Sequence, residues 1–190
     1  MKYGHDRFDL ERYQEIRDIA TEMMVAKTGL PVKQVKALFS SEDGYQTPKL
    51  GTRAAIFNGS KILLVRETTD DHWSLPGGWC EPNTNVADNC IKEAKEESGR
   101  DIVLDRVIAI RNHQANVHNH KRVERAINVC NVFFLAHEAG GDFSPNTETD
   151  ACQYFDYDHL PPLSVQRNSQ AEIKMCFAAL KDANWQVRFD

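Results

Sequence analysis

Residues 73–79 read Trp-Ser-Leu-Pro-Gly-Gly-Trp, and residues 92–99 read Lys-Glu-Ala-Lys-Glu-Glu-Ser-Gly. Between them the sequence predicts a helix, because Asn85 can cap its start, with Asp88 three residues further on, and Gly99 suits its C-cap. At about 100° per residue, the apolar side chains of this helix form one arc. The arc consists of Val86, Ala87, Cys90, Ile91 and Ala94. We therefore expect the helix to pack this face against the rest of its domain.

Three glutamates, Glu93, Glu96 and Glu97, follow the border of that apolar arc. A solvated charged face is the usual reason for such a pattern. Here, however, the acids lie in the last turns of the helix, where they repel one another and where the helix dipole disfavours negative charge. Two like charges roughly 4 Å apart cost about 4 kcal/mol at an effective dielectric of about 20, falling towards about 1 kcal/mol in water.

A divalent cation would reverse this repulsion. Mg²⁺ and Mn²⁺ take oxygen ligands, and Mg²⁺ keeps several waters, which leaves positions for phosphate oxygens and an attacking water. The pair Gly77-Gly78 precedes the helix and lets the backbone approach a metal without interference from side chains. We predict a Mg²⁺ site, with Mn²⁺ as an alternative, at the acidic edge of the helix.

At these residues the sequence resembles the signature of the Nudix hydrolases. That signature reads Gly, five residues, Glu, seven residues, Arg-Glu, an apolar residue, any residue, Glu-Glu, any residue, Gly and an apolar residue. The matching positions here are Gly78, Glu93, Ala94, Glu96, Glu97 and Gly99, and the preceding Leu-Pro-Gly matches as well. The resemblance extends over roughly residues 50–162.

Three positions depart from the signature. Thr84 stands where the family has Glu, Lys92 where it has Arg, and Arg100 where it has an apolar residue. In the family that Glu and Arg support the loop and the helix, so the Thr and Lys together look like a paired replacement of a structural contact. The acids that the resemblance assigns to the metal are unchanged.

The resemblance implies both a fold and a site. The fold is α+β, a Nudix-like α/β/α sandwich with a mixed β-sheet. The implied catalytic and metal-binding residues are Glu93, Glu96, Glu97 and the carbonyl of Gly77. Glu96 and Glu97 would be metal ligands, and Glu93 a ligand or the base that orients the water. Many members of the family add an acid from a loop before the last strand, for which Glu148 is the best placed and Asp150 the second choice, although loop acids are usually solvated.

The N-terminal segment narrows the comparison to a subgroup. A Nudix-like domain after about 50 helical residues is similar to bacterial enzymes that hydrolyse nucleoside diphosphates linked to another group X, such as CDP-choline pyrophosphatases and proteins named ADP-ribose pyrophosphatase. CDP-choline or a related CDP-alcohol is the favoured substrate. Trp79, Trp73 and Tyr45 could stack on a base or face a quaternary ammonium. The attraction of an aromatic face for such a cation is roughly 0.5–2 kcal/mol. Core packing is nevertheless the commoner role for each of these residues. Arg66 and Arg53 could hold substrate phosphates, although strand-end arginines are more often solvated.

Residues 1–48 are predicted to form a helical segment. Apolar residues recur at spacings of three and four from residue 8 to about residue 39. Asp9 can cap the first helix, and Gly29, followed by Leu30-Pro31, ends it before a short second helix. Two helices are too few for a core of their own, so their apolar stripe is expected to cover the main domain or a second subunit, and a homodimer is favoured. Residues 49–190 then form the Nudix-like domain.

After a polar linker over residues 40–48, the pattern changes to strands. Asn58-Gly59 lies between two apolar, β-prone runs and predicts a type I′ hairpin. Further strands are expected at 102–110, 126–136 and 151–157, and helices near 85–98 and 168–181. The nearly continuous apolar run within 126–136 is typical of a strand covered on both faces.

Composition limits the protein class. The 190 residues include 23 Lys and Arg against 28 Asp and Glu, a net charge of −5, so binding to nucleic acid by charge alone is not expected. The first residues lack the apolar run of a signal peptide, and no window is apolar enough for a membrane span, so a cytoplasmic protein is expected. The five cysteines contain no CxxC pair and are interpreted as small buried thiols.

The sequence therefore predicts a Mg²⁺-dependent pyrophosphohydrolase that cleaves a nucleoside diphosphate linked to X by direct attack of water, since no Ser or Cys lies in a recognisable nucleophile motif. An ADP-ribose or nucleotide-sugar pyrophosphatase is an alternative. An RNA exonuclease or decapping enzyme, and a nucleotide- or RNA-binding regulator without turnover, are further alternatives. The run from His113 to Arg125 is interpreted first as a solvated loop, and second as a contact for X or for an RNA backbone.

Overall fold

The computed structural model describes residues 6–29, 31–39, 48–112 and 129–190. The chain divides into two compact units, Met1–Thr47 and Pro48–Asp190. The predicted linker over residues 40–47, with Tyr45, and the basic run over residues 113–125 lie outside the described residues.

The N-terminal unit consists of α1 (Arg7–Thr28) and α2 (Val32–Phe39). Gly29 ends α1 with a left-handed φ of 70°, as predicted. The predicted N-cap at Asp9 is wrong: Asp6 is the cap, and its side chain accepts a 2.8 Å hydrogen bond from the Asp9 amide. Asp9 lies instead in the first turn, where its negative charge still favours the helix dipole.

The apolar stripe of α1 is exposed within its own unit. None of the α1 residues is buried, and Phe8, Ile16 and Met23 are 66%, 61% and 68% exposed. The described contacts between the two helices include a 2.8 Å ion pair between Lys36 and Asp18. This helix therefore presents a row of large apolar side chains to its surroundings.

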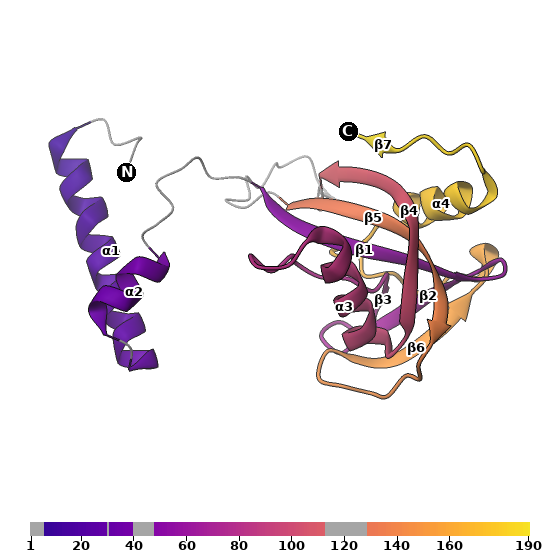
Figure 1. Ribbon diagram of the computed structural model, residues 1–190, viewed down its shortest axis with the longest axis horizontal. Coiled ribbons are helices and arrows are strands. Elements are labelled where there is room, and N and C mark those ends of the chain that lie inside the picture. Colours follow the sequence, from indigo (N-terminus) through magenta and orange to yellow (C-terminus); the bar gives the residue numbers. More distant parts are fainter. Residues whose placement is uncertain (1–5, 30, 40–47, 113–128) are drawn as a thin grey trace. The chain divides into compact units, whose positions relative to one another are not determined.

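The second unit is built around one mixed sheet, in which the described residues form seven strands (Figure 1). The strands are β1 (Lys49–Asn58), β2 (Lys61–Glu67), β3 (Trp73–Ser74), β4 (Asp101–Asn112), β5 (Val129–Gly140), β6 (Thr149–Phe155) and β7 (Arg188–Phe189). Their order is β3-β2-β1-β5-β4-β7, and β6 pairs with β2. The pairs β1–β5 and β4–β7 are parallel, and the other pairs are antiparallel.

The β1–β2 hairpin differs from the predicted one at its turn. Asn58 pairs with Lys61, so the two loop residues are Gly59 and Ser60. Gly59 alone has a positive φ, of 60°. The predicted type I′ turn centred on Asn58-Gly59 is therefore wrong, because a type I′ turn needs positive φ at both central residues whereas a type II′ turn needs it only at the first.

The two faces of the sheet are covered by α3 (Val86–Ser98) and α4 (Gln170–Lys181), which confirms the α/β/α sandwich (Figure 1). Successive residues of β1 point to opposite faces. Ala54 and Ile56 pack with Cys90 and Ala94 of α3. On the other face, Ala55, Phe57 and Ile62 pack with Ile173 and Phe177 of α4. The central strand β5 is buried from Asn131 to Ala136, as its apolar run predicts.

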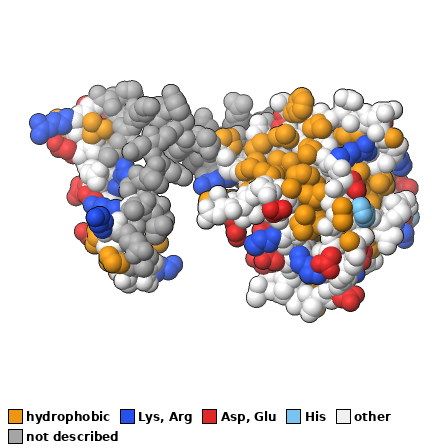
Figure 2. Space-filling view, viewed as in Figure 1, with side chains coloured by type: hydrophobic (Ala, Val, Ile, Leu, Met, Phe, Trp, Pro, Cys, Tyr) orange, Lys and Arg blue, Asp and Glu red, His pale blue; other side chains and the backbone are white. Residues whose placement is uncertain are grey.

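The buried face of α3 differs from the predicted arc. Ile91 is 36% exposed, whereas Glu97 is only 3% exposed and lies inside the domain rather than at the border. Figure 2 shows hydrophobic side chains gathered beside α3, over β4 and β5. Leu104 and Val107 of β4 are among the partly buried side chains on this face. The helix is thus rotated so that a carboxylate, and not Ile91, points inward.

Two further predictions concern the ends of strands and the thiols. The last predicted strand ends at Phe155 rather than Tyr157, because a 3₁₀ turn begins at Tyr157. All five cysteines lie in described segments and are free thiols, of which only Cys90 and Cys176 are fully buried.

None of the helices in the described ranges is both long and apolar enough to span a membrane.

Candidate active site

The loop that follows β3 runs alongside β1 and is hydrogen-bonded to it. The Ala54 amide donates to the Pro76 carbonyl and the Thr52 amide to the Gly78 carbonyl, each at 2.8 Å. The Cys80 amide donates in turn to the Leu50 carbonyl at 2.8 Å. The loop therefore behaves as an extra strand at the edge of β1, and its backbone position is fixed on that side.

The two glycines of this loop are needed for different reasons. Gly77 has a φ of 142°, and a side chain there would collide with the carbonyl of Thr52. At Gly78 a Cβ would collide with the carboxylate of Glu93, which shows that this carboxylate lies directly against the loop. The pair therefore lets β1 on one side and an acid of α3 on the other approach the same backbone.

Glu97 connects α3 to this loop. Its Oε2 accepts a 2.8 Å hydrogen bond from the Gly77 amide. Burial raises the pKa of Glu97 to about 7, although the Gly77 hydrogen bond and the positive charge of Arg53 lower it in part. Burying an ionised carboxylate is costly unless it is compensated. The contacts that the protein supplies therefore do not fully offset the cost of burying the ionised carboxylate of Glu97.

Glu93 lies among other acids. Burial raises its pKa first, and the like charges of Glu96 and Glu148 raise it further, while Lys92 lowers it. The Glu93 side chain is 16% exposed and that of Glu96 is 57% exposed. The structure therefore brings Glu148, the first choice among the predicted loop acids, into the electrostatic environment of α3.

The loop before β6 is attached to the end of α3. Thr149 Oγ1 donates to the Glu97 carbonyl at 2.6 Å, and Asn146 Nδ2 donates to the Glu96 carbonyl at 3.0 Å. The side chain of Asn146 also accepts from the Glu148 amide at 2.9 Å. These contacts fix the backbone that carries Glu148, while its own side chain stays exposed.

The second predicted loop acid has a different partner. Asp150 forms a two-point contact with Arg66, at 2.7 Å to Nε and 2.9 Å to Nη2. This hydrogen-bonded pair holds the pKa of Asp150 below its usual value. Arg66 could therefore bind a substrate phosphate only by sharing or leaving Asp150, and Asp150 is less available than Glu148 to a metal.

Arg53, predicted to bind phosphate, is 6% exposed and points into the loop. Its Nη1 donates to the carbonyls of Gly77 and Leu75. Burial lowers the pKa of this guanidinium, and the neighbouring Glu97 partly offsets that effect. In this structure Arg53 holds the loop, and a metal could share the Gly77 carbonyl only through its second lone pair.

Lys92 stands where the signature has Arg, and it contacts three acids. Its Nζ lies 3.1 Å from both Glu81 and Glu96 and 3.8 Å from Glu93. Hydrogen bonds to Glu81 and Glu96 raise the pKa of Lys92. The acid that supports the basic residue of the helix is therefore Glu81, three positions before Thr84.

The aromatic residues divide between core and surface. Trp73 packs edge-on against Phe155, with ring centroids 4.8 Å apart, so it has the predicted core role. Trp79 is 56% exposed and lies in the loop directly after Gly78, with an isolated bridge to Gly51. Of these two tryptophans, Trp79 is the one available for contact with a ligand.

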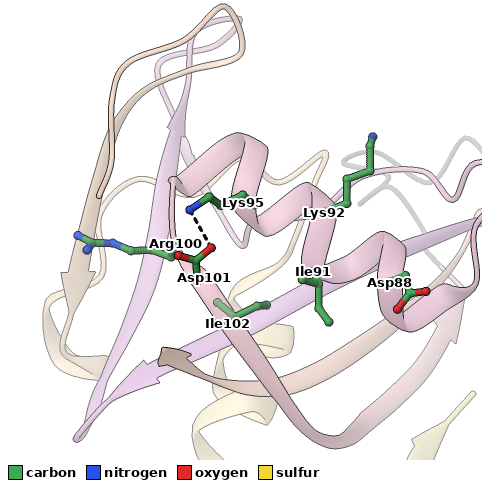
Figure 3. A pocket seen from close by; sticks show the side chains of 7 residues that line it. All are labelled: Asp88, Ile91, Lys92, Lys95, Arg100, Asp101 and Ile102. Carbon is green, nitrogen blue, oxygen red and sulfur yellow. Dashed lines mark ion pairs between the residues drawn. The ribbon is translucent and has the colours of Figure 1, made fainter. Parts of the chain in front are cut away.

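A pocket of about 400 Å³ lies on another face of α3 (Figure 3). It is lined by Asp88, Ile91, Lys92, Lys95, Arg100, Asp101 and Ile102. Lys95 forms a 2.8 Å ion pair with Asp101, drawn as a dashed line, and Arg100 forms one of 3.0 Å with Glu138. The charges of Lys92, Lys95, Arg100 and Asp101 are thus paired within the protein, and the pocket does not contain the acids of the candidate site.

The candidate site supplies the oxygen donors that a hard divalent cation prefers, although these donors do not lie close together in this structure. Within the described segments, no three carboxylate, imidazole or thiol groups form a ready metal cluster. The candidate donors are nevertheless all oxygens: the carboxylate of Glu97 is buried, and those of Glu96 and Glu148 are exposed, with Glu96 paired to Lys92. That donor set suits Mg²⁺ or Mn²⁺, because Mg²⁺ keeps several waters and binds through a few carboxylates together with substrate phosphates.

Sequence reasoning missed a group of polar residues behind the loop. Glu67, Ser74, Asn168 and Glu172 are buried, and Arg167 pairs with Glu67 at 3.0 Å. The available signal was an acid at the end of an apolar strand and a capping box at the start of α4. Neither signal shows that these residues meet, because they are about 100 positions apart.

Comparison with known proteins shows two family matches along the chain. Residues 47–175 match the family described as the NUDIX domain. Residues 1–39 match the family described as the UDP-X-like, N-terminal oligomerisation domain. The first match covers most of the unit that contains the sheet, and the second covers the two N-terminal helices.

Three relatives cover most of the chain. A Bacillus subtilis (strain 168) protein named as a candidate ADP-ribose pyrophosphatase, YjhB, is 35% identical over 190 residues, which is 100% of this chain and 89% of that protein. A crystal structure of an ADP-ribose pyrophosphatase from Streptococcus suis 89-1591 is 45% identical, with a TM-score of 0.67, covering 76% of this chain and 100% of that one. A crystal structure of a UDP-X diphosphatase is 28% identical, with a TM-score of 0.68, covering 100% of this chain and 90% of that one.

Proposed function

The chain belongs to the Nudix hydrolase family, and we propose that it hydrolyses nucleoside diphosphates linked to a small group X, with Mg²⁺ or Mn²⁺ as cofactor. The reaction adds water across the phosphoanhydride bond and releases a nucleoside monophosphate and phosphoryl-X. The observation that supports this proposal best is the position of Glu97, which is buried, bonded to the Gly77 amide, and next to Glu93 and Glu96 on one helix.

The proposed metal ligands are the carboxylates of Glu96, Glu97 and Glu148, with the carbonyl of Gly77 as a further ligand. A bound Mg²⁺ or Mn²⁺ would neutralise phosphate charge and lower the pKa of a bound water. Glu97 cannot move far, because Gly77 holds it from the loop. Glu96 and Glu148 are exposed, so their carboxylates can turn towards the same ion.

Glu93 is the proposed base or a further ligand. Its carboxylate lies against Gly78, and burial together with neighbouring acids raises its pKa. A carboxylate with a raised pKa is a better proton acceptor near neutral pH than an ordinary surface glutamate. Glu93 is therefore suited to accept a proton from the water that attacks phosphorus, and Lys92, 3.8 Å away, balances part of the local negative charge.

Two substrate classes are supported by different observations. ADP-ribose and UDP-linked compounds are favoured by the names of the relatives that cover most of the chain. CDP-choline, favoured from the sequence, is supported by the exposed ring of Trp79 beside the loop, because aromatic faces attract quaternary ammonium groups. In either case Trp79 and Arg66 are the proposed contacts with the substrate, and the buried Arg53 holds the loop.

A substrate screen tests the proposal. The full chain should be assayed with Mg²⁺ against ADP-ribose, UDP-sugars, CDP-choline and a short capped RNA, with identification of both products. Formation of a nucleoside monophosphate and phosphoryl-X supports the proposal, and a tenfold difference in kcat/KM, about 1.4 kcal/mol, decides between ADP-ribose and CDP-choline. Hydrolysis of RNA alone, or of none of these compounds, would reject it.

We further propose that the N-terminal helices join two chains into a homodimer. The α1 stripe is exposed in its own unit, and residues 1–39 match a family described as an oligomerisation domain. A row of exposed, large apolar side chains on one helix face usually marks an interaction surface. Sedimentation of the full chain should show a dimer, and a chain that stays monomeric at micromolar concentration would contradict this part of the proposal.

A further inference from the structure

A polar cluster, buried except for the partly exposed Arg167, lies behind the loop of the site at the start of α4. We call it the rear cluster, and it consists of Glu67, Ser74, Arg167 and Asn168. The Glu67 side chain is 1% exposed; its Oε1 accepts a 2.6 Å hydrogen bond from Ser74 Oγ, and its Oε2 lies 3.0 Å from Arg167 Nη2. Both oxygens of this buried acid therefore have partners, as a stable buried carboxylate requires.

Asn168 is the member of the rear cluster that touches the loop itself. It is fully buried, and its Oδ1 accepts a 2.8 Å hydrogen bond from the Leu75 amide. Its Nδ2 is buried and has no hydrogen-bond partner in the described residues. An unpaired buried donor costs free energy. The favourable contact of this side chain is therefore the hydrogen bond that its oxygen accepts from the loop.

The segment before Asn168 is paired with β3, which immediately precedes the loop. The Trp73 amide donates to the Pro162 carbonyl, and the Ser164 amide donates to the Trp73 carbonyl, both at 2.9 Å. The Asn168 amide then donates to the Ser164 carbonyl at 2.9 Å, and Ser169 begins α4 with a full capping box. Asn168 is thus held by backbone contacts on one side and by the first turn of a helix on the other.

A short series of contacts leads from Asn168 to the acids of α3. Leu75 lies two residues before Gly77, and Arg53 Nη1 donates to both of their carbonyls. The Gly77 amide in turn holds the carboxylate of Glu97. We propose that Asn168 is a positioning residue, which sets the position of the Leu75–Gly77 backbone and, through it, the position of Glu97 for metal binding and turnover. This inference rests on the proposed function, because it concerns the same site.

The main test is the variant Asn168→Leu, which keeps the size of the side chain and removes the oxygen. Partners that hold metal ligands in place are typically worth on the order of tenfold in affinity or activity. We therefore expect kcat to fall by about tenfold, KM for the nucleotide to change little, and the Kd for Mn²⁺, measured by titration without substrate, to rise by a similar factor. Hydrogen exchange at the Leu75 and Gly77 amides should become faster.

The matched control is Ile173→Val, with Ile173→Ala as a more severe form. Ile173 is fully buried on α4 and belongs to the same apolar core as Leu75, but its amide donates to the Ser169 carbonyl and not to the loop. These two variants should lower the melting temperature as Asn168→Leu does, but leave kcat, Mn²⁺ affinity and exchange at the loop amides close to wild type. If they change these three quantities as much as Asn168→Leu does, the effect is general destabilisation and the inference is wrong.

A second variant keeps the test open if Asn168→Leu does not fold. Ser74→Ala removes one hydroxyl from the rear cluster, introduces no clash, and should shift kcat and Mn²⁺ affinity in the same direction by a smaller factor. Unchanged Mn²⁺ affinity and unchanged exchange at the loop amides in both Asn168→Leu and Ser74→Ala would overturn the inference, even for an active enzyme. A wild type that binds Mn²⁺ but hydrolyses no diphosphate would instead reject the proposed function, and the binding and exchange results would still decide the role of Asn168.

Discussion

The ammonium group of Lys92 lies 3.1 Å from the carboxylate of Glu81, eleven residues earlier in the chain. The same group lies 3.1 Å from Glu96, so one cation is shared between the loop and the acidic edge of α3. Thr84 contributes its backbone, since its amide donates to the Glu81 carbonyl at 3.2 Å. Replacement of an acid at position 84 is thus compensated by another acid in the same loop.

Replacing Lys92 with Met should destabilise the metal-free protein, because Glu81, Glu93 and Glu96 would lose their common cation. The pair is partly exposed, so we expect a small loss of unfolding free energy in urea at low salt, and a smaller one at high salt. Added Mg²⁺ should stabilise this variant more than the wild type. Lys95→Met is the matched control: it loses the pair with Asp101 on the same helix, and its response to Mg²⁺ should be that of the wild type.

Replacing Glu97 with Gln should cut turnover by at least roughly two orders of magnitude, about 2.7 kcal/mol, while the fold persists. The amide is nearly isosteric with the carboxylate, and only the charge is lost. Mg²⁺ should raise the melting temperature of the variant less than that of the wild type, because stabilisation by a ligand falls as Kd rises. Asp88→Asn, an exposed acid on another face of α3, is the control and should keep near-normal turnover. A fully active Glu97→Gln enzyme would reject the site assignment.

The raised pKa of Glu97 predicts how the stability of the metal-free protein depends on pH. Its pKa is raised from 4.5 to about 7 in the folded state, so the unfolded chain loses the proton first as the pH rises. Stability should therefore fall between about pH 4.5 and pH 7, by at most about 3 kcal/mol from this group, and then level off. Urea unfolding in EDTA across this range should show the fall in the wild type and a smaller one in Glu97→Gln. Parallel pH curves for the two proteins would contradict the prediction.

The replacement of an apolar residue by Arg100 at the end of the signature is explained by Glu138. Arg100 Nη1 lies 3.0 Å from Glu138 and 2.7 Å from the Gly141 carbonyl, and the Tyr154 hydroxyl donates to Glu138. We expect Arg100→Leu to cost about 2 kcal/mol in unfolding free energy, because it leaves a partly buried carboxylate without its cation. The double variant with Glu138→Leu should recover most of this loss, which a double-mutant cycle can measure. Additive effects would show that the two residues act independently.

The exposed stripe of α1 predicts the effect of charge on assembly. Ile16→Glu together with Met23→Glu should convert the dimer to a monomer in sedimentation, because two charges would have to be buried in the interface. The helix itself should persist, since both positions are exposed in a single chain. Glu15→Gln, an exposed polar position on the same helix, should leave the dimer intact. A dimer that survives both charged substitutions would place the interface elsewhere.

The sequence predicted the local structure of the site well, because local structure depends on neighbours along the chain. Asn85 caps α3 and Gly99 ends it with a left-handed φ of 66°, as predicted. The acids lie on one helix beside a loop that needs both glycines. Predictions failed where two nearby candidates compete, as at the N-cap of α1, where Asp6 was chosen over Asp9, and at the hairpin, where the turn is one residue further on.

The amino-acid sequence by itself predicted the family, through the resemblance of its motif, and the helices and candidate acids of the site, because periodicity and spacing are properties of a contiguous chain. Tertiary structure alone decided that Glu97 is buried, that Arg66 is paired with Asp150, and that Asn168 reaches the loop. The physical reason is that burial and ion pairing depend on which residues, as far as 100 positions apart in the pair of Glu67 with Arg167, the fold brings together. A carboxylate acquires its pKa, and an asparagine its partner, only once those surroundings exist.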